Sequence, residues 1–302
     1  MMPPGDGIAR LEARLASPLH RVDLAGLLEL WQHDDVIVET VRPKQLEDCP
    51  DLPLRVRGAL GNALADASRA GQFDPGPFDR PDTFRLLFDW TPPGKRGGEI
   101  AQPAIILSDV IGNRVEVRVR LFGLAAWHGP RVLGALASAL EGGVAVRNRG
   151  VRVCFAVKSA RIERFAGVAL DWNGNASSAV LSLCTPMVIR RAKRVQITPE
   201  SLFRAILRRP AALAPWMRCA LLEPGPELNR TPDTTMAGIH AERWERTSKR
   251  DPGIGKIVEG FGGVVRIDGK LDNWIPWLRL AELTAIGSET ALGMGAFRLN
   301  LF

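Results

Sequence analysis

A run of basic residues, RRAKR at 190–194, is the part of this sequence whose residue types and spacing point most directly to chemistry. Arginine recognises phosphate through a planar, bidentate pair of hydrogen bonds, and lysine supplies a mobile point charge. The stretch 187–220 holds eight basic residues against one acid, Glu200. A solvated helix face would explain Arg204 and Arg208, but it explains the RRAKR run less well. The pattern therefore favours contact with the backbone of a nucleic acid.

The segment GSETALGMG, residues 287–295, is the second candidate. Glycine allows positive φ angles and a close approach of the backbone, so amides here could form a nest for phosphate oxygens. A P-loop is excluded because no Gly-Lys-Ser/Thr follows. A dinucleotide-binding turn is excluded because the segment precedes a strand instead of opening a helix. A tight helix-to-strand connection without a ligand is the alternative interpretation.

Groups that could transfer a proton near neutral pH are few. The chain has four histidines and no tyrosine, which excludes a phenol as acid or base. His128 lies in AWHGP, a loop between a predicted strand and a predicted helix. Catalytic residues are common in such loops, although ordinary polar residues are more common. His240 opens a predicted strand and is a candidate for nucleic-acid contact, whereas His20 and His33 fall in an N-terminal segment, 7–33, that we expect to be helical.

Metal and cofactor chemistry have no clear signature in the sequence. No cluster of acids has the spacing of a metal site, and the four cysteines form no C-x-x-C pair. This argues against a zinc ribbon and a disulfide framework and suits a reducing cytoplasm. The sequence has neither the pattern of a signal peptide nor an apolar run of about 20 residues. We expect a cytoplasmic protein that uses no metal or cofactor and has no membrane partner.

The amino-acid composition also favours a nucleic-acid partner, but it is less specific than the motifs. The formal net charge is +7, and 33 of the 40 basic residues are arginine. An arginine-rich excess fits a nucleic-acid partner, but the codon usage of a GC-rich genome would produce the same bias.

The elements that must position these residues repeat one order twice. The first half predicts strand, helix, strand, strand, helix and strand at 36–41, 54–69, 83–90, 115–121, 130–141 and 151–158. The second half predicts a strand at 179–189, a helix from Thr198 and Pro199, strands at 239–247 and 262–268, a helix at 272–285 and a last strand, AFRLNLF. This β-α-β-β-α-β order is the ferredoxin-like motif.

We therefore expect an α+β fold of two tandem ferredoxin-like (RRM-like) domains with antiparallel sheets. A length of 302 residues suits two domains. The expected domains are residues 1–165, with a helical N-terminal extension, and residues 166–302, with the glycine-rich segment.

Five blocks of the sequence, in order, carry a family resemblance. They are RVRGALGNAL (55–64), VRLFGLA (119–125), LCTPMVI (183–189), WERTSKR (244–250) and the stretch from GFGGVV to the C-terminal LNLF (260–302). Together they resemble the CRISPR-associated repeat RNA-processing endoribonucleases of the repeat-associated mysterious protein superfamily, over residues 36–302.

The resemblance implies that the chain binds CRISPR repeat RNA, with a hairpin as the expected form, and cleaves precursor guide RNA. In that family the ribose 2′-hydroxyl attacks the adjacent phosphate without a metal and leaves a cyclic phosphate. The residues expected to contact RNA are Arg55, Arg190, Arg191, Lys193, Arg194, Arg246, Lys249, Arg250, Gly287, Ser288, Thr290, Gly293 and Gly295.

The expected catalytic group is His128 with Arg42 and Lys44. The family concentrates catalytic groups in the loop before the first helix, which here supplies Arg42 and Lys44 but no histidine. We expect the first and third strands to run parallel, which would put His128 at the same sheet edge as that loop. His128 would then move the proton while the two cations stabilise the pentavalent phosphate.

Two alternatives remain, because Asn62, Ala285 and Ser288 stand where a member of the family would often carry histidine or lysine. The chain could be a non-cleaving subunit that caps the 3′ repeat hairpin of a guide RNA, with other effector-complex subunits as partners. It could also be a structural backbone subunit, which the C-terminal block favours least.

Overall fold

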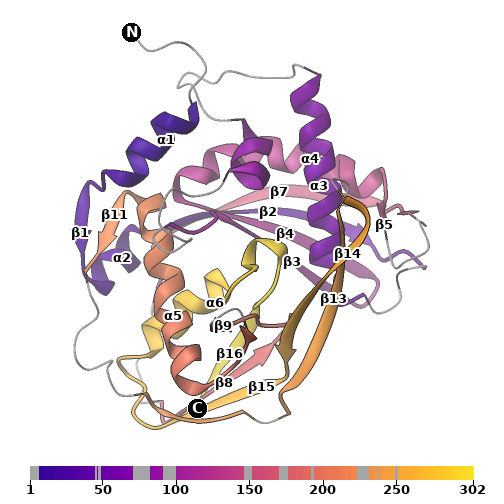
Figure 1. The fold of residues 1–302 in the computed structure, drawn as a ribbon. Coiled ribbons are helices and arrows are strands. Elements are labelled where there is room, and N and C mark those ends of the chain that lie inside the picture. Colours follow the sequence, from indigo (N-terminus) through magenta and orange to yellow (C-terminus); the bar gives the residue numbers. More distant parts are fainter. Residues whose placement is uncertain are drawn as a thin grey trace. The chain divides into compact units, whose positions relative to one another are not determined.

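The computed structural model describes residues 7–44, 46, 49–70, 82–90, 100–145, 152–169, 176–191, 194–222, 231–236, 238–248 and 251–302. The chain divides into two compact units (Figure 1). The first unit is Met1–Gly167 with Ala212–Leu221, and the second is Val168–Ala211 with Leu222–Phe302. No helix in these described ranges is long and apolar enough to cross a membrane.

The first unit contains a four-stranded antiparallel sheet in the order β3-β4-β2-β7. Its chain order is β2, α3, β3, β4, α4 and β7, so the first and third strands of the motif lie side by side at the centre. The bounds are β2 Gln32–Val41, α3 Leu52–Arg69, β3 Ala104–Ile111, β4 Arg114–Phe122, α4 Gly129–Glu141 and β7 Val157–Ala166.

The alternation of apolar and charged residues along β4 explains why α3 and α4 pack on one face of this sheet. Its odd-numbered positions from Val115 to Leu121 are fully buried, and its even-numbered positions carry Glu116, Arg118 and Arg120. A strand of period two turns one set to each face. The apolar set faces the core formed with α3 and α4, and the charged set lies on the opposite face.

The segment that precedes the main sheet is only partly helical. The helices α1 Gly7–Ala16 and α2 Leu24–Leu30 flank a short strand, β1 His20–Val22. This strand pairs in parallel with β11 Cys219–Leu221, which explains why residues 212–221 cluster with the first unit. The 3-10 helix η3 Ala214–Met217 precedes β11.

Two strand predictions in the first half are wrong. The segment 83–90 is helical, with the π-turn η1 at Arg85–Asp89. The Asp82 carboxylate accepts a hydrogen bond from the Arg85 amide at 2.8 Å, a local cap that favours a helical turn. A short apolar run cannot be assigned from its periodicity alone. The second strand of the motif is β3. The fourth is β7, which overlaps the predicted range 151–158 only from Val157 on. Earlier in that range, the described residues form the short strand β6 Arg152–Val153, which pairs with β5 Val144–Ala145.

The second unit repeats the topology of the first. Its four-stranded antiparallel sheet has the order β12-β15-β8-β16, and the chain order is β8, α5, β12, β15, α6 and β16. The bounds are β8 Ser178–Leu183, α5 Pro199–Leu213, β12 Asp233–Thr235, β15 Val264–Asp268, α6 Ile275–Thr284 and β16 Phe297–Leu301. The expected α+β class with tandem ferredoxin-like sheets is confirmed.

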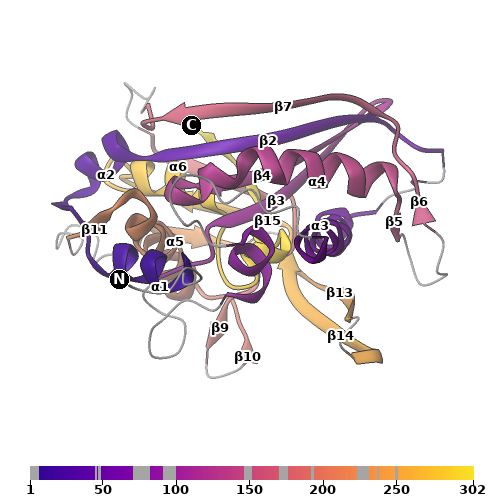
Figure 2. The same cartoon turned by 90° about the horizontal axis from the view of Figure 1, so that it is seen from above.

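The strand predicted at 239–247 does not belong to that sheet. It is β13 His240–Ser248, which pairs with β14 Asp251–Gly262 in a long hairpin that projects from the unit (Figure 2). The second strand of the sheet is the three-residue β12, too short to be recognised from sequence.

Candidate functional site

Segment 185–195 is the centre of the candidate site, because it contains the basic run 190–194 and pairs with two other elements of the second unit. Met187 exchanges backbone hydrogen bonds with Phe261 of β14, at 2.8 and 2.9 Å. Val188 forms bridges to Gly287 and Ser288 of the glycine-rich loop, which we define as residues 285–296. The segment then continues into the arginine hairpin, β9 Arg190–Arg191 and β10 Arg194–Val195. The structure thus joins two of the stretches in which RNA contacts are expected, the arginine hairpin and the glycine-rich loop, to the base of the long hairpin.

The glycine-rich loop is a tightly folded connection. Gly287 and Gly295 have φ angles of 96° and 78°, and a Cβ there would lie 2.4 Å from the Val188 carbonyl oxygen and 1.9 Å from that of Ile286. Only glycine allows both the positive φ and this close approach. The loop also contains the short 3-10 helix η5 Thr290–Leu292.

Internal hydrogen bonds use many amides of this loop. Ser288 donates to the Val188 carbonyl at 2.6 Å and Gly295 donates to that of Pro186 at 2.9 Å. Further backbone donors are Ile286, Leu292 and Gly293. These amides are therefore not available as a phosphate nest, and the backbone has the tight-connection geometry. Thr290 is also buried, so its hydroxyl does not reach the surface.

Arginines of α5 divide between the surface and the core. Arg204 and Arg208 are exposed, as a solvated or RNA-facing side of the helix requires. Arg209 is buried, and its Nε donates to the Thr284 carbonyl at 3.3 Å, just before the glycine-rich loop. Burial lowers the pKa of Arg209 to about 10. Arg209 therefore ties α5 to the start of the loop.

Several expected RNA contacts cannot be placed. Lys193, Lys249 and Arg250 lie outside the described residues, as do the side chains of Arg191, Arg194 and Arg246. Arg190 is described, and its guanidinium forms an ion pair with Glu289 at 3.1 Å.

His240 lies at the base of the long hairpin. Its Nδ1 is 3.0 Å from the Gly238 carbonyl oxygen and its Nε2 is 3.1 Å from the Glu242 carboxylate. The Gly238 hydrogen bond, followed by the charge of Glu242, raises the pKa of His240. Two acceptors around one exposed imidazole favour its cationic form.

The expected group of His128, Arg42 and Lys44 is not assembled. The two central strands of the first sheet are antiparallel, with Val41 paired to Arg114 and His33 paired to Phe122. The expectation of parallel strands is wrong. Strand β3, which follows helix α3, runs in the same direction as β2, and β4 returns from β3 through a hairpin, so β4 runs opposite to β2. Arg42 and Lys44 follow the C-terminal end of β2, whereas His128 follows β4 at the opposite end of the strand pair. The two ends, at Val41 and His33, are eight residues apart, which corresponds to about 27 Å of antiparallel strand.

The surroundings of these residues also differ. His128 is buried, and its Nδ1 lies 2.8 Å from the hydroxyl of Thr83. Arg42 donates to the Leu46 carbonyl at 3.3 Å, and Lys44 is exposed. Arg55 forms an ion pair with Asp51 at 2.7 Å in the first turn of α3, at the same sheet end as Arg42.

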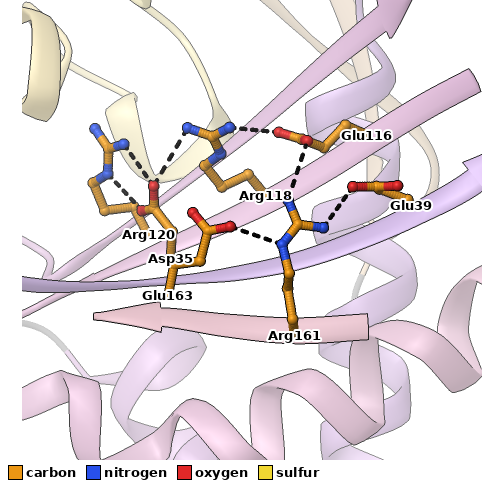
Figure 3. A network of polar contacts seen from close by, with 7 residues as sticks. All are labelled: Asp35, Glu39, Glu116, Arg118, Arg120, Arg161 and Glu163. Atoms are coloured by element: carbon orange, nitrogen blue, oxygen red, sulfur yellow. Dashed lines mark hydrogen bonds and ion pairs between the residues drawn. The ribbon is translucent and has the colours of Figure 1, made fainter. Parts of the chain in front are cut away.

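A carboxylate–arginine network covers the face of the first sheet opposite α3 and α4 (Figure 3). Arg118 bridges Asp35 and Glu116, at 3.3 and 2.5 Å, and Arg161 bridges other carboxylates. Four carboxylates meet three guanidinium groups, so the network has a net charge of −1 and does not form a basic surface. Its members are Asp35, Glu39, Glu116, Arg118, Arg120, Arg161 and Glu163. Sequence reasoning missed it, although the acid–arginine alternation of β4 was a partial signal.

His33 lies beside this network. Its ring stacks on Phe165, with centroids 4.7 Å apart and planes 8° apart. Burial, followed by the nearby Arg120 charge, lowers the pKa of His33 to about 4. His33 is therefore neutral at physiological pH and fills a packing role in β2, not in the N-terminal helix.

Comparison with known proteins agrees with the resemblance seen in the sequence. Residues 181–297 match the family model described as CRISPR-associated endoribonuclease Cas6. This match confirms the predicted resemblance over residues 181–297, which are 117 of the 302 residues. Thermus thermophilus Cas6 is similar in structure, with a TM-score of 0.51, 15% identity, and coverage of 89% of this chain and 99% of that chain. A Cas6 product complex gives a TM-score of 0.51 at 19% identity, over 89% of this chain and 99% of that chain. At these identities the likeness to Cas6 structures establishes the fold. No curated protein matches the chain.

Proposed function

We propose that this chain binds CRISPR repeat RNA through the arginine hairpin and its neighbours, and cleaves precursor RNA to give guide RNA. One observation carries the proposal. Segment 185–195 connects the arginine hairpin, the glycine-rich loop and β14 into one array. The same array lies within residues 181–297, the part of the chain that matches the Cas6 family.

The proposed reaction is a transesterification that needs no metal. The ribose 2′-oxygen attacks the adjacent phosphorus as it loses its proton, and the bond from phosphorus to the 5′-oxygen breaks. The leaving 5′-oxygen takes up a proton, and the upstream product ends in a 2′,3′-cyclic phosphate. Such a reaction requires in-line positioning, proton transfer and stabilisation of the phosphate charge.

His128 is the proposed proton-transfer group. Imidazole titrates near neutral pH, and the hydrogen bond with Thr83 supports one orientation of the ring. Because the antiparallel strands separate Arg42 and Lys44 from His128, we assign those two cations, with Arg55, only to contacts with the RNA backbone.

The binding proposal is tested with Arg190→Glu combined with Arg194→Glu. The reversed charges should weaken binding of a repeat hairpin and flatten its salt dependence by about 0.7 in log–log slope for each lost phosphate contact. Arg266→Glu with Arg298→Glu, an equal charge change on the exposed face of the second sheet, is the control. Unchanged affinity and slope in the first pair would remove the arginine hairpin from the interface.

Non-cleaving capping of a guide RNA hairpin is the second candidate. It is favoured by Asn62 in α3, where the first-helix motif of the family often places a histidine. Incubation of the wild-type protein with repeat RNA, followed by a denaturing gel, separates the two functions. Tight binding without any cut product would assign the capping role.

A further inference from the structure

Arg190 and Glu289 form an ion pair between the arginine hairpin and the glycine-rich loop. The Arg190 Nη2 lies 3.1 Å from the Glu289 Oε1, and the side chains are 40% and 25% exposed. Both groups therefore remain within reach of a ligand from solvent. The neighbouring Ser288 amide donates to the Val188 carbonyl at 2.6 Å, which fixes the loop two residues from Arg190.

The backbone of Glu289 is unusual for a residue with a side chain. Its φ and ψ are 61° and 18°, the left-handed region that glycine adopts most easily. Glycines stand nearby at 287, 293 and 295, all with positive φ. Backbone strain of this kind persists where the surroundings fix it, often at functional sites. Loop geometry alone therefore does not explain why position 289 carries a glutamate and not a glycine.

The charge of Glu289 is opposite to that of the surface it joins. Glu289 pairs with the arginine hairpin, whose run RRAKR at 190–194 holds four basic residues and no acid. A phosphate that approaches Arg190 meets repulsion from the Glu289 carboxylate and must compete with it for the guanidinium. Interfaces use such unfavourable elements to reject partners that lack compensating contacts.

We propose that Glu289 is a specificity-determining residue, which holds Arg190 in the free protein and releases it only to an RNA of complementary shape. This inference rests on the proposed binding of RNA at the arginine hairpin. A non-cognate RNA is repelled by the carboxylate without compensation. A repeat hairpin displaces the carboxylate because its other contacts along segment 185–195 and the loop hold a phosphate next to Arg190.

The test measures the affinity of Glu289→Gln for a repeat hairpin and for a scrambled single-stranded RNA of equal length, over the same series of salt concentrations. The amide keeps the size of the side chain and removes its charge. We expect the scrambled RNA to bind about 3- to 10-fold more tightly, with a salt slope steeper by about 0.7, the value for one added phosphate contact. The repeat hairpin should change less, so the ratio of the two affinities should fall.

Two further variants keep the result interpretable. Glu289→Gly, which suits φ of 61°, should lower the ratio in the same direction and guards against a folding defect in Glu289→Gln. Asp268→Asn is the matched control, since Asp268 pairs with Arg266 at 2.9 Å in β15 of the second sheet, and it should leave the ratio unchanged.

A double-mutant cycle with Arg190→Gln assigns the effect to the pair. In the Arg190→Gln background, Glu289→Gln should no longer change the ratio. The inference would be overturned if Glu289→Gln tightened the binding of both RNAs equally. It would also be overturned if Glu289→Gln changed neither affinity although Arg190→Gln weakened binding. The proposed function would stand in both cases. Binding that is insensitive to Arg190→Gln would overturn the proposed surface and the role of Glu289 together.

Discussion

Arg120 donates two hydrogen bonds to Asp35 across the β2–β4 pair, from Nε to Oδ1 at 2.7 Å and from Nη2 to Oδ2 at 2.8 Å. The two side chains are only 7% and 1% exposed. A buried bidentate pair costs desolvation, but loss of one partner leaves the other charge buried without compensation.

Asp35→Asn should therefore lower the free energy of unfolding by about 3–5 kcal/mol, measured by denaturant titration. The largely exposed pair Arg69–Asp66 supplies the control, and Asp66→Asn should cost less than about 1 kcal/mol. Asp35→Leu combined with Arg120→Met should recover much of the loss, because an apolar pair removes both buried charges. A cost for Asp35→Asn as small as that of Asp66→Asn would show that the buried pair is not a determinant of stability.

His33 predicts a loss of stability in mild acid. Its pKa of about 4 in the folded protein lies below the ordinary value of 6.5, so the unfolded chain binds a proton that the folded chain does not bind between these values. The free energy of unfolding should fall as the pH falls from about 6.5 to about 4, by up to about 3 kcal/mol. Denaturant titrations across this range should show a shallower pH dependence for His33→Gln, whereas exposed His20→Gln should keep the wild-type dependence.

Gly295→Ala should destabilise the second unit by at least about 2 kcal/mol, because the new Cβ would lie 1.9 Å from the Ile286 carbonyl oxygen. Gly269 is the matched control, since its φ is +126° but nothing lies within 4 Å of a Cβ. Gly269→Ala should carry only the conformational cost, about 1 kcal/mol. Thermal unfolding of the two variants compares them directly. Equal shifts would mean that close approach at Gly295 contributes nothing.

The proposed cleavage should survive chelation. Because the 2′-hydroxyl is the nucleophile, EDTA should leave the rate unchanged, and a deoxyribose on the 5′ side of the scissile phosphate should abolish cutting. A deoxyribose one nucleotide further upstream is the control and should be cut. Activity that disappears in EDTA and returns with magnesium would contradict the mechanism.

The sequence predicts those elements that have a clear period. Helix α3, helix α4 and strand β4 each show apolar residues at the spacing of their secondary structure, and all three lie within a few residues of the predicted bounds. Strand β3 was missed although AIILSDVI is as apolar as TFRLLFDW at 83–90, because a short apolar run does not distinguish a strand from a helical turn. Strand β12 was missed because three residues carry no period.

The candidate site was only partly predictable, for a different reason. The arginine hairpin and the glycine-rich loop have local sequence signals, so their residues could be named in advance. The direction of β4 relative to β2 follows from the β-α-β-β-α-β topology with antiparallel sheets that the sequence predicts, so the expectation of parallel central strands is inconsistent with that fold. The antiparallel direction places His128 and Arg42 at opposite ends of the sheet. The carboxylate–arginine network likewise depends on the cross-strand register, which pairs Asp35 with both Arg120 and Glu163.

His128 gives the sharpest test of the catalytic assignment, because its imidazole is buried and held by Thr83. If His128 transfers a proton, His128→Asn should slow single-turnover cleavage by ~10²-fold or more at unchanged RNA affinity. Thr83→Val is the control that removes the hydrogen bond and keeps the imidazole, so it should slow cleavage far less. Denaturant titration of both variants measures the structural contribution separately, since loss of a buried hydrogen-bond partner costs about 1–3 kcal/mol. A His128→Asn protein that is less stable but cleaves at the wild-type rate would assign the imidazole to packing alone, and the proton-transfer group would then have to be sought elsewhere in the chain.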